Sequence, residues 1–358
     1  MHRMYRALFW VLILFSTSAL ADIRIATWNI ERLGHGNNKS YPALALIGSQ
    51  FDFIAVQEAM NSDGLSTFKR ELEKRTGQKW QMMYSHRIGR GSYKEKYAFV
   101  WRDSAVEYVD GAVVYLDNTD RYAREPYSAR FRSRKTGTQF VAATAHILYG
   151  KSVSDRTPEI QALAAYWEWL SEVYPGTPRV LLGDFNLAPS HNAWRSLKAS
   201  ARPAVTHGAT TVSSVDGRFA NLYDNIWLGK HNPLGVTGAG IFNGPRALGW
   251  SHKKFRKHAS DHVPVYITIG NAQLINTQPT STESIAPPAG TSHAQRSAAP
   301  IASRASAPSQ NEVRGNRNSQ IFHLPHCPSY NRIAEHNRVP FASKQAARDA
   351  GYRIAGNC

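Results

Sequence analysis

The sequence predicts an α/β fold in which two packed β-sheets are flanked by helices. Between residues 22 and 270, short segments rich in Val, Ile, Tyr, Phe and Trp alternate with segments of helical periodicity, and turn residues bound the strands. Each sheet and each amphipathic helix has an apolar face that must be covered. So many strands with interleaved helices favour two sheets packed together, with helices on the outside.

Seven segments carry the strand pattern and two carry the helix pattern. The predicted strands are 23–30, 51–59, 97–102, 139–147, 179–186, 221–228 and 263–269. The predicted helices are 65–77 and 158–175. In the second helix, apolar side chains recur at helical spacing at Ile160, Leu163, Ala164, Trp167 and Leu170. We expect this stripe to lie in the core rather than in a ligand site.

The first 21 residues have the features of a secretory signal peptide. A positively charged start is followed by the short apolar run ALFWVLILF, and the segment ends in Ala19-Leu20-Ala21. We expect cleavage before Asp22 and a secreted or periplasmic protein; the alternative is a retained anchor. The apolar run is too short for an ordinary membrane span, and no later segment is long and apolar enough to cross a bilayer.

The chain is strongly basic. Its formal net charge of +17 falls to +15 when Arg3 and Arg6 are lost with the signal peptide. A surplus of this size favours polyanionic partners such as nucleic acid, phospholipid or envelope polymers. The two cysteines, Cys327 and Cys358, lie near the C-terminus. An exported chain meets an oxidising environment, so the pair predicts a disulfide.

A change in composition separates the main domain, residues 22–270, from the rest of the chain. Residues 271–317 are rich in Ser, Ala, Pro and Thr and hold few large apolar residues. They cannot bury enough surface to offset the cost of ordering, so we expect a flexible, disordered linker. Apolar and aromatic residues return in 318–358, which predicts a second, very small module.

Acidic, amide and histidine residues gather at the ends of the predicted strands. They are Asn29, Glu58, His146, Asp184, Asn186, Asp224, Asp261 and His262. Each of them has a plain structural explanation by itself, such as a turn cap or a satisfied surface histidine. Strand ends that converge on one edge can build a site from distant parts of the chain. Because the full set is hard to obtain by chance, we expect a functional site there.

The motifs WN, QE, SYKE, REP, AH, GDFN, YD and SDH occur in this order along residues 22–270. Their order resembles the endonuclease/exonuclease/phosphatase superfamily, and more closely its deoxyribonuclease I branch. GDFN and SDH are shared across the superfamily and indicate phosphoester chemistry in general. GRGSYKEKYAFVWR and YAREPYSARF are narrower and favour the nuclease branch. The family fold is a four-layer α/β sandwich, which agrees with the elements predicted above.

The resemblance implies a divalent metal site. Asn29 and Glu58 match the family's metal-binding pair, and hard oxygen ligands suit Mg²⁺ or Mn²⁺. Such an ion would draw charge from a phosphate oxygen as the pentavalent state forms. The structural calcium loops of the family have no match in this sequence, so we carry over no Ca²⁺ site and leave a need for Ca²⁺ open.

The resemblance also implies two catalytic histidines. His146 and His262 match them, and one should help activate water while the other protonates the leaving oxygen. Each histidine needs an acidic partner that fixes its tautomer and stabilises its charged form. By resemblance, Glu95 supports His146 and Asp224 supports His262.

The remaining family positions match residues that would bind or orient the phosphate. Asp184 and Asp261 match the other acids of the site, and the division of water activation between Asp184 and His262 stays open. Asn186 and Arg124 are implied to bind the scissile phosphate, since a guanidinium can fork onto two oxygens. Tyr93 matches a tyrosine that packs against a sugar beside the cut; the alternative is a plain hairpin residue.

A basic run precedes the last catalytic pair. The family's groove-entering arginine is replaced here by Met60, and the segment WSHKKFRKHASDH supplies positive charge instead. The basic residues of this run are Lys253, Lys254, Arg256 and Lys257. We expect them to contact phosphates and to raise affinity without selecting a sequence. The alternative is an ordinary solvated face.

The last segment resembles the small zinc domain of the Ada DNA-repair protein. His323 and Cys327 match its first two ligand positions and Cys358 its last, whereas Ala355 occupies the remaining one. A tetrahedral Zn²⁺ site would then lack a ligand unless His326 or His336 took that place, for which the spacing signal is weak. For an exported chain we expect a Cys327–Cys358 disulfide in preference to Zn²⁺. The bridge would close a loop of about thirty residues and stabilise the module by about 3 kcal/mol.

Together these features predict an exported, metal-dependent, monomeric endonuclease that cuts DNA with little sequence preference and leaves 5′-phosphate and 3′-hydroxyl ends. RNA as a further substrate stays open. The alternatives are a sphingomyelinase-like phosphodiesterase of the same fold, a subunit similar to the cytolethal distending toxin nuclease, and a catalytically dead DNA-binding module. The SYKE and REP motifs argue against the first, and the complete set of acids and histidines argues against the last.

Overall fold

The computed structural model describes residues 22–36, 38–231, 233–274, 313–317, 319–327, 330–333, 335–355 and 358. The chain divides into two compact units, Met1–Ala289 and Gly290–Cys358, and each is described by itself. The expected signal peptide, and residues 275–312 of the expected linker, lie outside the described residues. Among the described residues, no helix has the length and apolar character needed to cross a membrane.

Two mixed sheets form the main unit. In order across the first sheet, the strands are β11 (Val236–Ile241), β12 (Val265–Ile269), β1 (Ile23–Leu33), β2 (Phe53–Ala59), β4 (Lys96–Arg102) and β3 (Trp80–Tyr84). In the second sheet they are β5 (Val106–Val114), β6 (Tyr127–Ser133), β7 (Gln139–His146), β8 (Arg179–Asp184), β10 (Asp224–Gly229) and β9 (Ala201–Pro203). The neighbours β1–β2 and β7–β8 are parallel, and a helical crossover joins each pair.

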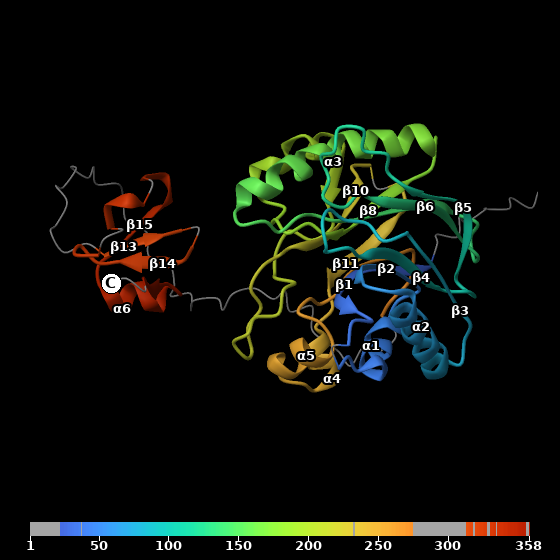
Figure 1. The fold of residues 1–358 in the computed structure, drawn as a ribbon, viewed down its shortest axis with the longest axis horizontal. Coiled ribbons are helices and arrows are strands. Elements are labelled where there is room, and N and C mark those ends of the chain that lie inside the picture. The colour runs from blue at the N-terminus through green and yellow to red at the C-terminus, as the bar shows by residue number, and fades with distance from the viewer. Residues whose placement is uncertain are drawn as a thin grey trace, which may run out of the picture. The chain divides into compact units, whose positions relative to one another are not determined.

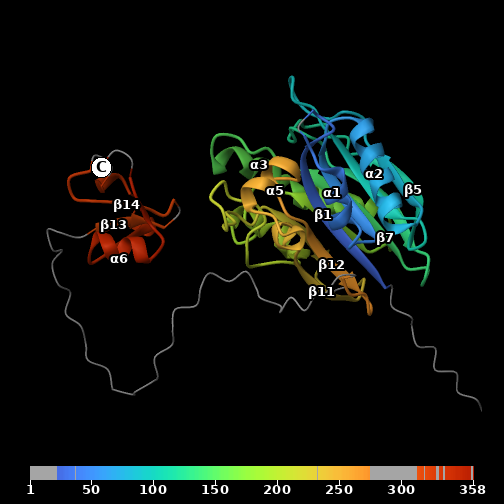
Figure 2. The same ribbon diagram turned by 90° about the horizontal axis from the view of Figure 1, so that it is seen from below.

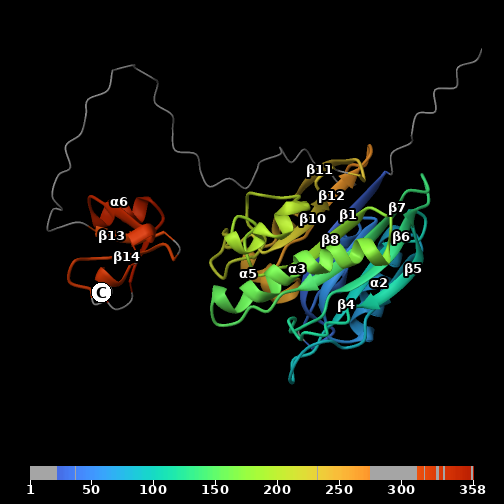
Figure 3. The same cartoon turned by 90° about the horizontal axis from the view of Figure 1, so that it is seen from above.

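Helices cover the outer faces of both sheets, so the main unit has four layers (Figure 1). The helices on the first sheet are α1 (Tyr41–Gly48), α2 (Ser62–Thr76), α4 (Gly244–Leu248) and α5 (His252–His258). The second sheet is covered by α3 (Val153–Val173) and the 3-10 turns η1 (Asn192–Arg195) and η2 (Leu197–Ala199). Figure 2 views the layer of α1 and α2, and Figure 3 shows α3 crossing the strands of the second sheet. The predicted four-layer α/β sandwich is confirmed.

The apolar core lies in three layers because the central strands are buried on both faces. On β1, Ile23 and Ile25 point between the two sheets, whereas Ala26 and Trp28 point toward the helices of the first sheet. This is the period of two that a strand imposes on its side chains. A third cluster joins the second sheet to α3. Strands covered on both faces are almost continuously apolar in sequence, which is why the central ones could be predicted.

Each predicted strand overlaps an observed one, but the sequence missed others. The missed elements are β3, β5, β6, β9, β11, α1, α4 and α5. Several of the missed strands lie at or near a sheet edge, where one side of the strand needs no apolar cover. In β11, Gly240 packs closely against Tyr266, whose Oη would lie 2.8 Å from a Cβ at that position. Glycine lowers the strand signal of such a segment.

The second unit is a small sheet with one helix against it. Its described elements are β15 (Arg338–Phe341), β13 (Val313–Asn316), β14 (Ile321–His323), β16 (Arg353–Ile354), α6 (Lys344–Asp349) and the 3-10 turns η3 (Tyr330–Arg332) and η4 (Glu335–Asn337). The strand β13 lies inside 271–317, which the sequence assigned to the linker, so those four residues are a correction. A segment with Val313 as its one apolar residue gives too weak a pattern to predict a strand. The strand forms because it pairs with β14 on one side and β15 on the other.

The module contains the expected disulfide. Cys327 and Cys358 are bonded, with their Cα atoms 4.8 Å apart. Cys327 is buried beside Phe322 and Ala347 in a small apolar cluster, so the bridge ties the C-terminus to that cluster. The bonded sulfurs are not thiolates, and the pair therefore offers no ligands to Zn²⁺ in this state.

Phe53 tests the packing between the sheets. It is fully buried, and its ring centroid lies 5.4, 4.8 and 5.5 Å from those of Phe99, Phe131 and Phe140. We expect Phe53→Ala to lower the free energy of unfolding by about 3–5 kcal/mol, because the lost ring leaves a cavity. Urea denaturation followed by circular dichroism measures this.

Two variants serve as its controls. Phe53→Leu should lower the free energy of unfolding by less than Phe53→Ala, since leucine keeps most of the side-chain volume. Leu116→Ala, at a side chain that is 75% exposed, should change the stability by no more than about 0.5 kcal/mol. Equal stability losses for Phe53→Ala and Leu116→Ala would contradict this account of the core.

Candidate active site

A cavity of about 840 Å³ opens where strands of both sheets end. Predicted site residues that line it are Glu58, Tyr93, Arg124, His146, Asp184, Asn186, Arg256, Asp261 and His262. The other three predicted acids and amides, Asn29, Glu95 and Asp224, are fully buried beneath this lining. Segments as distant in sequence as Asn29 and His262 thus meet in one place. The cavity has the concave shape expected of a small-molecule or chain-binding site.

Strand register aligns the polar side chains of the second sheet. His146 pairs with Asp184 across β7–β8, and Asp184 pairs with Asp224 across β8–β10. Neighbouring strands lie about 4.8 Å apart, so these residues stand side by side along one edge. In the first sheet the register of β1–β2 shifts after Asn29, and Glu58 lies at this irregular end of β2. The site is therefore built from the same end of both sheets.

His146 is held by Glu95, which lies just before β4. Its Nδ1 is 3.0 Å from both Glu95 oxygens, and Tyr93 Oη donates to the same carboxylate at 3.2 Å. Burial acts to raise the pKa of Glu95, but the charge and hydrogen bond of His146, with help from Arg124, lower it. Burial acts to lower the pKa of His146, but the Glu95 charge outweighs this and raises it. The carboxylate thus orients the ring and favours its protonated form.

His262 is held in the same way by Asp224, the first residue of β10. Its Nδ1 lies 2.7 Å from Asp224 Oδ2, and Asp224 is fully buried. Burial acts to lower the pKa of His262, but the charges of Asp224, Asp184 and Asp261 raise it well above its ordinary value. Both histidines therefore use Nδ1 for a carboxylate and leave Nε2 to face the cavity.

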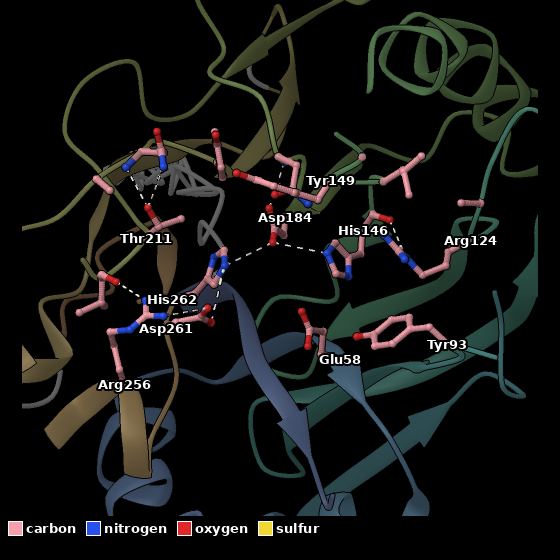
Figure 4. Close-up of a pocket in the computed structure, with 18 of the residues that line it drawn as sticks. Glu58, Tyr93, Arg124, His146, Tyr149, Asp184, Thr211, Arg256, Asp261 and His262 are labelled. Carbon is pink, nitrogen blue, oxygen red and sulfur yellow. Dashed lines mark hydrogen bonds and ion pairs between the residues drawn. The ribbon is translucent and has the colours of Figure 1, made fainter. Parts of the chain in front are cut away.

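The two free imidazole nitrogens face one carboxylate oxygen. Asp184 Oδ2 lies 3.6 Å from His146 Nε2 and 3.5 Å from His262 Nε2 (Figure 4). Asn29 Nδ2 donates to this same oxygen at 3.1 Å, and the backbone N–H of Asn186 donates to Oδ1 at 3.0 Å. Two groups that can transfer protons thus converge on one acceptor oxygen at the cavity.

Glu58 is the carboxylate best placed to hold a cation. It lines the cavity and adopts a left-handed backbone with φ of 59°, a strained conformation that only the surrounding structure can maintain. Asn29 Nδ2 donates to its Oε1 at 3.0 Å, and the backbone N–H of Arg32 donates to Oε2 at 3.1 Å. Carboxylate oxygens suit Mg²⁺ or Mn²⁺, so the residue present fits the implied ion.

Asn29 lies beside Glu58 as expected but presents a different atom. Its amide nitrogen faces Glu58 and Asp184, while its oxygen accepts from the backbone N–H of Glu31 at 2.9 Å. In this arrangement Asn29 orients the Glu58 carboxylate, and its own oxygen is directed elsewhere. The two residues of the expected metal-binding pair thus lie side by side, and Glu58 is the one that lines the cavity.

Arg124, Asn186 and Tyr93 form the wall around His146. Arg124 Nε donates to the His146 carbonyl at 3.0 Å, and its guanidinium lies 5.8 Å from the centroid of the Tyr93 ring. Asn186 has φ of 51° and donates through Nδ2 to the Ile147 carbonyl at 2.8 Å. Burial raises the pKa of Tyr93, which keeps its hydroxyl neutral. Beside His146, Arg124 and Asn186 are thus fixed by backbone carbonyls, and Tyr93 is fixed by its hydrogen bond to Glu95.

The basic run forms α5, and one of its four members lines the cavity. Arg256 does so, donates to the Val212 carbonyl and lies 3.8 Å from Asp261. Lys253, Lys254 and Lys257 are exposed on the same short helix and are not part of the lining. The helical turn separates side chains that the sequence places together, so three of the four lysines and arginines face solvent.

Sequence reasoning missed a group on another wall of the cavity. Tyr149 and Tyr223 line the cavity there. The buried Arg156 lies against both rings, with its guanidinium 4.2 Å from the Tyr149 ring centroid and 5.6 Å from that of Tyr223. The signal available in the sequence was weak: Tyr149 follows His146 by three residues in a loop, and Tyr223 directly precedes Asp224. Arg156 belongs to a helix whose visible pattern was apolar.

Comparisons with known proteins agree with this geometry. The model of the endonuclease/exonuclease/phosphatase family matches residues 26–262. A deoxyribonuclease of Thioalkalivibrio sp. (strain K90mix) is 50% identical over 277 residues, which cover 75% of this chain and 77% of that protein. Deoxyribonuclease-1-like 1 of Sus scrofa is 29% identical over 286 residues, covering 76% of this chain and 88% of that protein.

A solved structure shares the fold, and a second family model matches the C-terminal part of the chain. An endonuclease/exonuclease/phosphatase family protein from Bacteroides thetaiotaomicron shares the fold, with a TM-score of 0.53 and 16% identity over 70% of this chain and 98% of that chain. The ArfC family model matches residues 290–354. This match agrees with a small separate module, whose likeness to the Ada zinc domain stays a prediction.

The raised pKa of His262 can be tested directly. We expect Asp224→Asn to lower this pKa, because the largest compensating charge is lost and burial then favours the neutral imidazole. NMR titration of the imidazole resonances in EDTA measures it. Glu168→Gln, on an exposed face, should leave the His262 pKa unchanged. An unchanged value in Asp224→Asn would contradict the proposed pairing.

The same shift has a consequence for stability. Since the folded pKa of His262 is raised, its pairing stabilises the protein fully below the unfolded value of about 6.5 and is lost as pH rises through the folded pKa. Asp224→Asn should therefore destabilise the chain more at pH 6 than at high pH.

Proposed function

Because the chain belongs to the endonuclease/exonuclease/phosphatase family, we propose that its cavity hydrolyses phosphodiester bonds of DNA. The observation that carries this proposal is the meeting of two carboxylate-backed imidazoles at one oxygen of Asp184. Hydrolysis needs one group to take a proton from water and another to give a proton to the leaving oxygen, and this arrangement provides both. The 50% identity to a deoxyribonuclease supports DNA as the substrate.

The proton transfers follow from the positions of the rings. One imidazole, protonated because its carboxylate partner raises its pKa, gives its proton to the leaving O3′. Asp184, or the other imidazole in its neutral form, takes one proton from the attacking water, and the water oxygen bonds to phosphorus. Breaking the P–O3′ bond in this way leaves a 3′-hydroxyl and a 5′-phosphate. Each ring keeps its orientation during the reaction because its Nδ1 stays bonded to Glu95 or Asp224.

A divalent cation, Mg²⁺ or Mn²⁺, would be held by Glu58. When bound, it supplies positive charge to the phosphate oxygens as negative charge builds there. The left-handed backbone of Glu58 and the donation from Asn29 keep the carboxylate directed into the cavity before any ion arrives. Such preorganisation avoids the cost of reorienting the ligand during binding.

Binding of the substrate would depend on charge rather than on base identity. Arg124 and Asn186 stand beside His146, where a scissile phosphate would lie. The formal charge, +15 after loss of Arg3 and Arg6, and the exposed lysines of α5 would attract the DNA backbone. Backbone contacts carry no sequence information, so we infer little sequence preference and weaker binding at high salt.

We further propose that the protein is exported and acts as a monomer. The composition of residues 1–21 supports export, and the Cys327–Cys358 disulfide is of a kind that persists in oxidising compartments. N-terminal sequencing of the exported protein should find Asp22 first. A single copy of the chain contains the complete set of reacting groups, which supports activity as a monomer.

The histidines provide the first test of function. We expect His146→Ala and His262→Ala each to lower kcat for plasmid nicking by about 10²–10⁴-fold, because each removes a proton-transfer group. Conversion of supercoiled to nicked plasmid on gels measures this, with sphingomyelin and RNA as comparison substrates. His207→Ala, in an exposed loop, should keep the original rate. If His146→Ala nicked plasmid at full speed, the assignment of the site would fail.

Removal of the metal provides the second test. EDTA should abolish nicking, and added Mg²⁺ or Mn²⁺ should restore it. Glu58→Gln should raise the Mg²⁺ concentration that gives half-maximal activity by more than about 10-fold, since a charged ligand is lost. Glu71→Gln, on α2, is the matched control. Full activity in EDTA, or an unchanged Mg²⁺ requirement in Glu58→Gln, would overturn the proposed metal site.

A further inference from the structure

A tyrosine at the rim of the cavity takes no part in the chemistry above. Tyr149 lines the cavity, follows His146 by three residues and is 57% exposed. In Figure 4 it lies on the Asp184 side of His146, with Tyr93 on the opposite side. One face of its ring rests on the guanidinium of Arg156, which lies 4.2 Å from the ring centroid. Because Tyr149 is exposed and lines the cavity, a ligand in the cavity can reach it.

Arg156 is fixed as the support of this ring. Its guanidinium donates through Nε to the Tyr149 carbonyl at 2.7 Å and through Nη1 to the Asn186 carbonyl at 2.6 Å and Tyr223 Oη at 3.2 Å. It is buried, with 5% exposure, and the Tyr223 ring lies on it as well, at 5.6 Å. A cation held so firmly cannot swing out to meet a phosphate. It acts instead through the ring that it supports.

The cavity thus contains a rigid aromatic surface with a cation behind it. The cation draws electron density from the ring, which favours stacking on the electron-rich face of another heteroaromatic ring. In duplex DNA each internal base is covered on both faces by its neighbours, and only base edges are reached through the grooves. Tyr149 can therefore stack only on a base that has left the duplex stack.

Resting on the proposed DNA hydrolysis, we propose that Tyr149 is a stacking platform for an unpaired nucleobase beside the bond that is cut, and that the cavity accepts single-stranded DNA. The base would extend the column formed by Arg156 and Tyr149. Stacking of this kind tolerates all four bases, because every base has a π-face. The platform therefore agrees with recognition that depends little on sequence.

Tyr93 is not an equivalent surface. Its hydroxyl donates to Glu95, the support of His146, and its ring faces Arg124. A change at Tyr93 would disturb the catalytic histidine itself. Tyr149 is bound to the protein through its ring face and backbone instead, so its side chain can be altered without removing a contact to His146.

Steady-state kinetics on two forms of one sequence test the platform. With a single-stranded oligonucleotide, Tyr149→Ala should lower kcat/KM by roughly 5- to 150-fold, the range measured for loss of one stacked base. With the matching duplex the change should be no more than about twofold. Tyr149→Trp should retain the rate on the single strand. Tyr108→Ala, an exposed tyrosine of β5 outside the cavity lining, is the control.

Abasic nucleotides separate stacking from a structural effect. With the unaltered protein, kcat/KM should fall by the same factor when the single strand lacks a base beside the cut. On that abasic strand, Tyr149→Ala should lower kcat/KM no further, because the ring and the base act as a pair. Equal losses of Tyr149→Ala on single-stranded, abasic and duplex DNA would overturn the proposal, as would no loss on any of them.

A binding measurement distinguishes this inference from the proposed function. In EDTA, a single strand that carries 2-aminopurine should lose fluorescence when it binds the full chain, and Tyr149→Ala should abolish this quenching. Quenching by a chain that cuts no DNA would refute the proposed hydrolysis and uphold the platform. Cleavage without quenching at any labelled position would uphold the hydrolysis and refute the platform.

Discussion

The site depends on a single carboxylate oxygen that side chains of both sheets approach. Asp184 Oδ2 faces His146 from the second sheet and His262 from the segment before β12 of the first, and it accepts from Asn29 of β1. These groups can meet only if the two sheets pack face to face in one position. The aromatic rings packed between the sheets, such as those of Phe53 and Phe131, therefore set the positions of the site residues as well as the stability of the fold.

Burying so many ionisable groups is costly, and the structure offsets the cost by pairing. Glu95 and Asp224 are fully inaccessible, yet each bonds an imidazole Nδ1. Positive-φ backbones at Glu58 and Asn186 add strain of about 1–3 kcal/mol each. These local costs are concentrated around the cavity, and the three apolar layers of the main unit compensate for them. Residues of the site are thus optimised for position rather than for stability.

Chemistry and recognition are handled by different parts of the cavity. The imidazoles and their carboxylates lie where a phosphate would react. The aromatic and cationic groups, such as Tyr149 and Arg256, lie farther out on the lining of the cavity. In the proposed function, charge and stacking would increase the affinity for DNA without selecting a sequence.

By itself, the sequence determined the central strands, the polar residues at their ends and the only cysteine pair that can form. These signals are local: strand period, composition and the order of short motifs are all present in the unfolded chain. Only the tertiary structure decided which atom each residue presents. It turned the Asn29 nitrogen toward Glu58, brought Arg256 but not its neighbouring lysines to the cavity, and placed Tyr149 on Arg156. Such choices depend on register and rotamers set by contacts between distant segments, and no local pattern encodes them.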